Sequence, residues 1–191
     1  LRRGGQAHPT AGSDYIKFKD EEVFNILMSK GVSADGVGIT YDDASRVSNI
    51  STWFKGSTIT SFEELEYFTN VKTLNSQAFM NCKNLTIVTS SHLTSMDGDY
   101  HFRGCSSLRE VRIPNCTNIA SYDFQEVSSL QILEINAVKT IGGYSLYKCI
   151  NLGGQFNKEH LTSIGYAAMS NVAITSLILP SIVTIGGGDS Y

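Results

Sequence analysis

The second half of the chain repeats one apolar pattern every 21 to 23 residues. The most distinct column of this pattern is aromatic or large aliphatic, at Phe79, Phe102, Phe124, Leu146 and Met169. A unit this short cannot bury its own apolar side, so neighbouring units must stack and share one continuous core. The repeat therefore predicts a solenoid.

Further apolar columns keep the same spacing. Two precede the aromatic column, at Val71, Leu93, Cys116, Val138, Leu161 and Ile182, and at Leu74, Met96, Ile119, Ile141, Ile164 and Ile185. Three follow it, at Cys82, Cys105, Val127, Cys149 and Val172, at Leu85, Leu108, Leu130, Leu152 and Ile174, and at Val88, Val111, Leu133, Phe156 and Leu177. Chance does not hold this many columns in phase over five successive units.

The segment after the leucine column has the signal of a strand. Residues 108–113 and 130–135 alternate apolar and polar residues, and residues 174–179 repeat this pattern up to Pro180. Proline ends such a strand because it offers no N–H to the ladder. Strands that recur once per unit in one direction should pair in parallel. We interpret the other half of the unit, such as residues 141–146, as a turn and a short return segment.

The four cysteines fall in apolar columns that valine, leucine or isoleucine also fill, as buried free thiols commonly do. No two cysteines have the close spacing that a zinc site needs. We therefore expect structural thiols and no metal site. Cys82 and Cys105 lie on neighbouring units, so one disulfide between them stays open as an alternative.

The string Phe-x-x-Cys-x-x-Leu-x-x-Val, followed by a segment such as Leu161-Thr-Ser-Ile-Gly165, resembles the BspA-type leucine-rich repeat of Bacteroides surface proteins. The resemblance runs from Val71 to Gly187. It implies an α/β leucine-rich-repeat solenoid of about five 21–23-residue units with parallel strands, over residues 71–191, with the last unit incomplete. It also implies an extracellular or cell-surface location. Because such repeats also occur in phages, a virion is the alternative location.

The segment before the repeats has a different character. Residues 1–13 lack periodicity, and we expect a flexible tail. Residues 14–70 predict a small helical N-terminal cap with three short helices. The first follows Asp20, the second begins with a capping-box-like opening at Thr40, and the third opens at Ser61. The cap resembles the one that precedes the repeats in some BspA-like chains.

Composition and motifs argue against catalysis and against nucleic-acid binding. The net charge is −3, with 15 basic residues spread among 18 acidic ones, which gives no basic footprint for nucleic acid. The four histidines show no ligand spacing, and no serine lies in a Gly-x-Ser-x-Gly elbow. We therefore expect no enzymatic activity and no cofactor. No apolar stretch approaches the length of a membrane span, so we expect no membrane insertion.

Two surfaces are candidates for binding. The first is the set of residues that flank the buried strand column and should point outward: Ile87, Thr89, Glu110, Arg112, Ile132, Glu134, Gln155, Asn157, Ser176 and Ile178. Solenoids commonly bind partners through such a rigid sheet face. The second is an aromatic stripe at Tyr100, Tyr122, Tyr144 and Tyr166, which is either a ladder of stacked rings or a platform for a glycan or a partner protein.

Two functions follow as hypotheses. The first is a non-catalytic recognition or adhesion module that binds a protein, a matrix component or a glycan at a microbial surface. The alternative is a structural or assembly component, such as a phage or cell-surface fibre, in which the repeats are a rigid spacer. The apolar C-terminal unit predicts self-association or a partner chain there, unless residues 184–191 lie across it as a lid.

Overall fold

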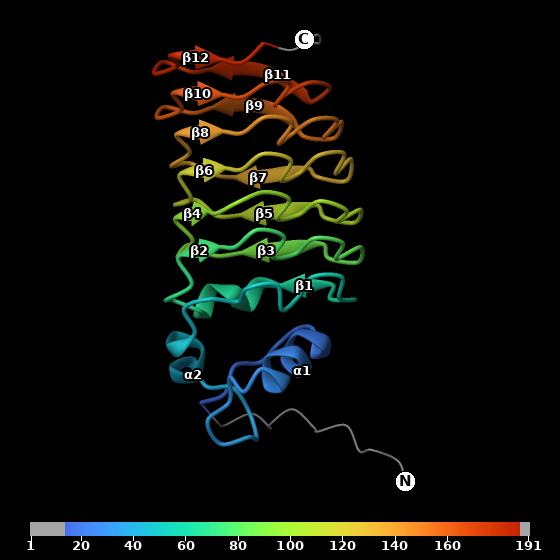
Figure 1. Cartoon of the computed structure of the whole chain (residues 1–191), viewed down its shortest axis with the longest axis vertical. Helices are drawn as coiled ribbons and strands as arrows, with labels where there is room; N and C mark the ends of the chain where they lie inside the picture. Colours follow the sequence, from blue (N-terminus) through green and yellow to red (C-terminus); the bar gives the residue numbers. More distant parts are fainter. Residues whose placement is uncertain (1–13, 188–191) are drawn as a thin grey trace.

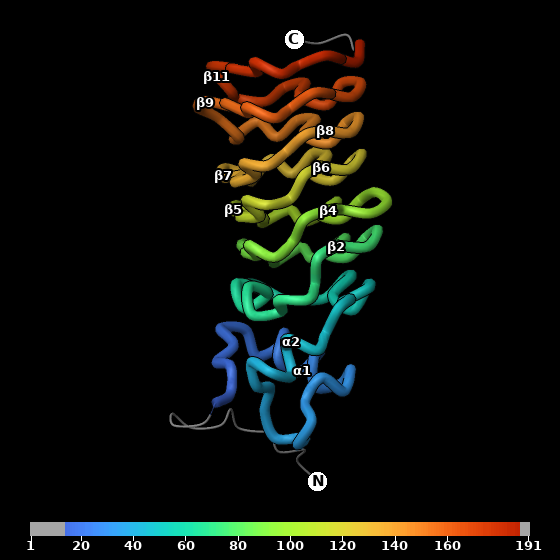
Figure 2. The backbone as a smooth tube through the Cα atoms, turned by 90° about the vertical axis from the view of Figure 1, so that its left-hand side faces the viewer, coloured from blue at the N-terminus to red at the C-terminus, as the bar shows by residue number. Residues whose placement is uncertain are grey.

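The computed structural model describes residues 14–187, which form a stack of coils with the helices at its N-terminal end (Figure 1). Figure 2 shows the coils edge-on, with the two ends of the chain at opposite ends of the stack. The expected flexible tail, residues 1–13, and the segment 188–191 lie outside the described residues. The elements before the repeats are α1 (Glu21–Ser29), α2 (Tyr41–Arg46), β1 (Ser61–Phe62) and the 3-10 helix η1 (Glu63–Tyr67). The strands that follow are β2 (Thr73–Leu74), β3 (Ile87–Thr89), β4 (Ser95–Met96), β5 (Glu110–Arg112), β6 (Asn118–Ile119), β7 (Ile132–Glu134), β8 (Thr140–Ile141), β9 (Gly153–Asn157), β10 (Ser163–Ile164), β11 (Ala173–Ile178) and β12 (Thr184–Ile185).

Each coil contributes one strand to each of two opposite sides of the stack. On one side, β1, β3, β5 and β7 form a four-stranded sheet, and β9 and β11 form a separate pair. On the other side, β6, β8, β10 and β12 form a sheet, and β2 pairs with β4. Every strand pair is parallel, which confirms the predicted solenoid with parallel strands. The second side was expected to hold only turns and return segments; each return segment instead begins with a two-residue strand, too short to show as alternation.

The predicted columns form one core through the stack. Phe79, Phe102 and Phe124 are fully buried, and their rings stack coil on coil, with centroids 5.4 Å and 5.0 Å apart. All four cysteines are buried free thiols, so Cys82 and Cys105 are not bridged. The thiol of Cys105 donates to the carbonyl oxygen of Phe79 at 3.0 Å, which ties one coil to the one before it. The cysteine column thus packs like valine and also satisfies a buried carbonyl.

Glycine lies where one coil approaches the backbone of the next. A Cβ added to Gly142 would lie 2.5 Å from the nitrogen of Ser121, and one added to Gly165 would lie 2.4 Å from the nitrogen of Gly143. A side chain at either position would push the coils apart. This contact is the physical reason for the glycine after the isoleucine column.

The N-terminal segment holds two capped helices, a 3-10 helix and the first strand of the stack. Asp20 accepts from the N–H of Glu22 at the start of α1, and Thr40 forms the expected capping box of α2. The third expected helix is the 3-10 helix η1, and the Glu64 side chain accepts from the N–H of Lys19 at 2.9 Å. β1 already pairs with β3, so the parallel sheet begins at Ser61.

Candidate binding surface

Three neighbouring strands bring six of the predicted outward residues together. The register aligns Ile87 with Glu110 and Ile132 in one row, and Thr89 with Arg112 and Glu134 in the next. The strand residues between these rows point inward, and all three are buried. We call the two rows the strand face.

The charged part of the strand face is a clamp around one guanidinium. Arg112 donates to Glu110 at 3.1 Å and to Glu134 on the next coil, also at 3.1 Å. The hydrogen bonds to Glu134 and then Glu110 raise the pKa of Arg112. All three side chains are more than a third exposed, so the ion pairs add little stability. The two ion pairs place the guanidinium between the two carboxylates.

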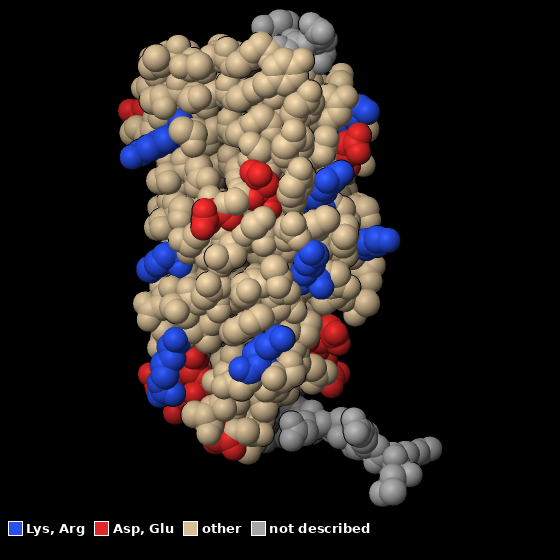
Figure 3. All heavy atoms as spheres, viewed as in Figure 1, with Lys and Arg blue, Asp and Glu red and all other residues tan. Residues whose placement is uncertain are grey.

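The apolar part of the strand face lies beside this clamp. Ile87 is half-buried and Ile132 is 37% exposed, one on each side of Glu110. Apolar side chains next to fixed charges are typical of a protein interface, where aliphatic contact supplies area and charges set orientation. Figure 3 shows that charged residues of both signs are interspersed on the side of the molecule it displays, so no broad single-sign surface dominates that view.

The other four predicted residues do not extend the strand face. Gln155 and Asn157 lie on β9, and Ser176 and Ile178 lie on β11, in the separate two-stranded sheet. The ten predicted residues are therefore divided between two separate sheets. The break coincides with Gly153 and Gly154, where the unit has an extra residue and Gly154 has φ of +80°.

In the tyrosine stripe, Tyr100, Tyr122 and Tyr144 form a ladder of stacked rings, and the ring of Tyr166 is tilted by 52° against that of Tyr144. Successive centroids are 5.1 Å apart between Tyr100 and Tyr122, and 5.4 Å apart between Tyr122 and Tyr144 and between Tyr144 and Tyr166. Because the rings cover one another's faces, the stripe presents ring edges and hydroxyls along its length. A sugar that packs on an aromatic face would find an open one only near Tyr166, which is 49% exposed.

The tyrosine backbone carries strain. Tyr100, Tyr122 and Tyr144 have φ between +54° and +66°, a region that costs an ordinary residue about 1–2 kcal/mol. Stacking stabilises each pair of rings by about 0.5–1.5 kcal/mol, so the gain from stacking nearly offsets the cost of the backbone conformation. Tyr166 lies three residues before its aromatic-column residue, whereas the other tyrosines lie two residues before theirs. Ala167 therefore takes the left-handed position in that coil, with φ of +49°.

A buried polar pair lies inside the stack, and the sequence did not reveal it. His101 and Asp123 are fully buried, and the Nδ1–H of His101 donates to Asp123 at 2.5 Å. The Nε2–H faces the carbonyl oxygens of Leu74 and Asp97, each at 3.1 Å. Burial alone would lower the pKa of His101, but the hydrogen bond and charge of Asp123 raise it. His101 and Asp123 each lie one residue before a member of the aromatic column, and this shared position is the signal in the sequence that could have revealed the pair. Because the pair has no exposure, it stabilises the stack rather than meeting a ligand.

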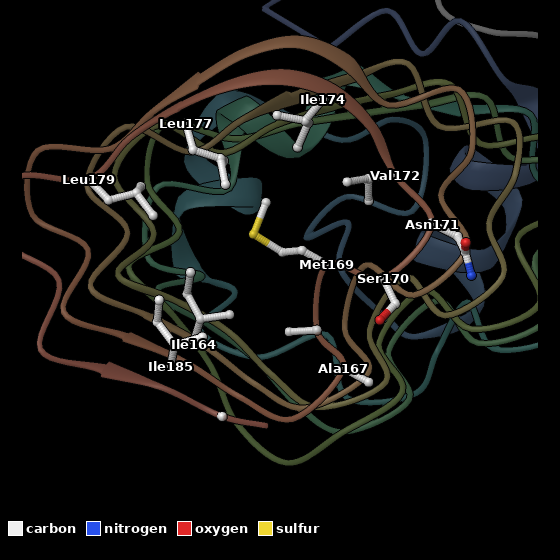
Figure 4. A pocket seen from close by; sticks show the side chains of 12 residues that line it. Ile164, Ala167, Met169, Ser170, Asn171, Val172, Ile174, Leu177, Leu179 and Ile185 are labelled. Carbon is white, nitrogen blue, oxygen red and sulfur yellow. The ribbon is translucent and has the colours of Figure 1, made fainter. Parts of the chain in front are cut away.

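The C-terminal end of the described coils is an open apolar cavity of about 420 Å³ (Figure 4). Met169 points into it, with Val172, Ile174 and Leu177 around it. The described part of the expected lid, residues 184–187, does not lie across this end: β12 continues the sheet beside β10, and Ile185 is 59% exposed at the rim.

No metal cluster and no membrane helix is present in the described part of the chain. Among residues 14–187, no three His, Cys, Asp or Glu side chains are grouped to hold a metal ion. No helix in that range is long and apolar enough to cross a membrane.

The repeats match a known family model. The model of the BspA type leucine rich repeat region matches six copies over residues 50–153 and 72–190. The chain belongs to the BspA-type leucine-rich repeat family. A search of curated proteins found no match.

Solved structures share the fold of this BspA-type protein. A leucine rich cell surface protein from Faecalibacterium prausnitzii A2-165 matches with 25% identity and a TM-score of 0.55, over 60% of this chain and 33% of that one. A leucine-rich repeat protein from Bacteroides ovatus ATCC 8483 matches with 19% identity and a TM-score of 0.59, over 71% and 35%. The T. pallidum leucine rich repeat protein matches with 20% identity and a TM-score of 0.51, over 62% and 67%. The BspA-type chain thus spans about a third of the first two proteins.

Proposed function

We propose that this chain is a non-catalytic recognition module at a microbial surface, which binds a protein or matrix ligand through the strand face. The observation that carries the proposal is the Ile87–Glu110–Ile132 row beside the Arg112 clamp, which joins exposed aliphatic area to fixed charges on a rigid sheet. The cell-surface protein of Faecalibacterium, at 25% identity, supports a surface location. Members of this repeat family are generally non-catalytic, which supports the absence of an enzymatic role.

A protein ligand fits the strand face better than a glycan fits the tyrosine ladder. The ladder buries its ring faces against one another, whereas sugars pack on exposed faces. We therefore place the tyrosine stripe second, as a source of hydroxyl hydrogen bonds for a glycan or for the edge of a bound protein.

Binding of the purified chain to a panel of extracellular-matrix proteins and glycans tests the proposal. The triple variant Ile87→Ala, Arg112→Ala and Ile132→Ala should lose the ligand that the parent chain retains. The matched control changes three exposed residues away from the strand face, Lys72, Lys139 and Glu159, to alanine and should bind normally. Undiminished binding of the strand-face variant would remove this face from the account.

The alternative function is assembly through one end of the stack. Met169, Ile174 and Leu177 form an apolar surface on which a second copy of this chain would bury its own end. The repeats would then serve as a rigid spacer, in a cell-surface fibre or a virion. Light scattering over a range of concentrations distinguishes the two functions: a monomer that retains a soluble ligand supports recognition, whereas concentration-dependent association supports assembly.

A further inference from the structure

The sheet that carries the strand face is interrupted between β7 and β9. Among residues 14–187, no backbone hydrogen bond joins the segment 129–137 to the segment 152–161. The preceding pair of coils is fully bonded over the same stretch: Ile132 donates to Arg109 at 3.0 Å, Ile113 to Glu134 at 2.9 Å, and Ala137 to Pro114 at 2.9 Å. Figure 1 shows β9 set farther from β7 than β7 is from β5.

The interruption is local, because the same two coils are tied on both sides of it. The backbone N–H of Glu126 donates to the carbonyl oxygen of Tyr147 at 2.7 Å, and the backbone N–H of Thr162 donates to that of Lys139 at 2.9 Å. β8 and β10 pair in regular register on the opposite side of the stack. The two coils are therefore joined on both sides of the unpaired stretch.

Two inner positions of β9 and its continuation hold other residue types than the regular coils do. Phe156 occupies the column of Val88 and Val111, and Lys158 occupies the position of Ile113 in its own coil. Both are buried, and the ammonium of Lys158 lies 4.9 Å from the Phe156 ring. The interruption therefore concerns the pairing of backbone groups, while the inner side chains of this stretch remain buried.

Backbone groups on both strands face the interruption. In a strand, the N–H and C=O groups of alternate residues point to opposite neighbours. Ile132 and Glu134 bond to β5, so the backbone groups of Leu133 and Ile135 point toward β9. Lys158 donates to Ile178 on the far side, so Asn157 directs its N–H toward β7.

We propose that the interruption between β7 and β9 is a binding site for an extended polypeptide segment of a partner protein, which inserts as an additional strand. Its backbone would pair with Leu133 and Ile135 on one side and with Gln155 and Asn157 on the other. Strand addition at an unpaired edge is a common mode of peptide recognition, in which the main chain supplies affinity.

The site also selects side chains. Leu133 is 9% exposed and Phe156 is 5% exposed, so inward side chains of the inserted strand must be small or β-branched. Outward side chains would lie beside Ile132 and Glu134 on the strand face. The inference rests on the proposed function and narrows its ligand to a protein with an extended segment of period-two polarity.

A peptide with the sequence of residues 108–115 is a direct probe, because this strand already fits between coils of the stack. The fluorescein-labelled peptide should bind saturably by fluorescence anisotropy at concentrations up to about 1 mM. The same peptide N-methylated at the positions of Val111 and Ile113 keeps its side chains and loses two donors. It should bind at least about tenfold more weakly.

Two variants of the protein supply the matched test. Asn157→Pro removes an N–H that faces the interruption and should weaken binding of the peptide about tenfold, whereas Asn157→Ala keeps that N–H and should bind normally. If the proline variant does not fold, the N-methylated peptide still decides the question. Equal binding of the two peptides, or no binding at about 1 mM, would overturn the proposal.

Hydrogen exchange of the free chain gives an independent reading. The amides of Leu133 and Ile135 should exchange much faster than the amide of Ile113, and the peptide should protect them. Protection of these amides in the free monomer would mean that β7 and β9 pair in solution and would refute the site. A dimer that protects them would make a second copy the occupant and would overturn the proposal as stated. Loss of matrix binding in the strand-face triple variant, with peptide insertion intact, separates this site from the proposed function.

Discussion

Removing one member of the buried His101–Asp123 pair should destabilise the whole stack. His101→Ala takes away the donor to Asp123 and the donor to Leu74 and Asp97. The carboxylate then keeps only the N–H groups of residues 101 and 120 in a fully buried position. Breaking a buried pair in this way typically costs about 3–5 kcal/mol. Asp123→Ala should cost a similar amount.

The double variant decides whether the pair acts as a unit. Ala78 and Ala168 occupy the same column, so alanine fits the backbone there. With both charges removed, the cost should fall short of the sum of the single costs by about 2–3 kcal/mol. Ser145→Ala is the control, since its buried hydroxyl has no hydrogen-bond partner among residues 14–187, and its removal should be neutral or slightly stabilising. Urea unfolding followed by circular dichroism measures all four variants, and additivity within about 0.5 kcal/mol would refute the reasoning.

Three further predictions concern pH, the thiols and the C-terminal cavity. Because Asp123 raises the pKa of His101 above the usual 6.5, the pair's contribution should be complete below pH 6.5 and lost as the pH rises through the folded-state pKa. The urea midpoint of the parent chain should therefore fall as the pH rises from 5 to 9. An equal fall in the double alanine variant would contradict this prediction. All four cysteines are buried, and burial raises the pKa of Cys149 to about 12 and that of Cys116 to about 11. A thiol reagent at pH 8 should therefore label the folded chain slowly and should label four thiols after denaturation. Two or more rapidly labelled thiols would show that the column assignment is wrong. Met169→Glu should abolish any concentration-dependent association seen by light scattering, whereas Met169→Leu should leave it unchanged; equal association of the two variants would place the contact elsewhere.

The fold was readable from the sequence because a solenoid repeats the same physical requirement in every coil. Phe79, Phe102 and Phe124 occupy equivalent, fully buried positions, so the burial predicted for one of them applies to the other two. The strands of the second side were missed because two residues, as in Thr140–Ile141, are too few to show alternation. Their pairing depends on the neighbouring coil, which no local pattern describes.

The candidate site was only partly readable. The outward direction of Arg112 and Ile132 follows from alternation, but the clamp by Glu110 and Glu134 depends on the register between coils. The extra residue at Gly153–Gly154 is visible in the sequence as a change in loop length. The loss of pairing between β7 and β9 depends on how two neighbouring coils lie against each other, so it appears only in three dimensions.

The most direct test of the recognition hypothesis is hydrogen exchange of the chain with a ligand retained from the matrix panel. The strand-face account predicts that binding protects β3, β5 and β7 and leaves the opposite sheet of β6, β8, β10 and β12 unchanged. Protection confined to that opposite sheet, or to the C-terminal cavity around Met169, would contradict it.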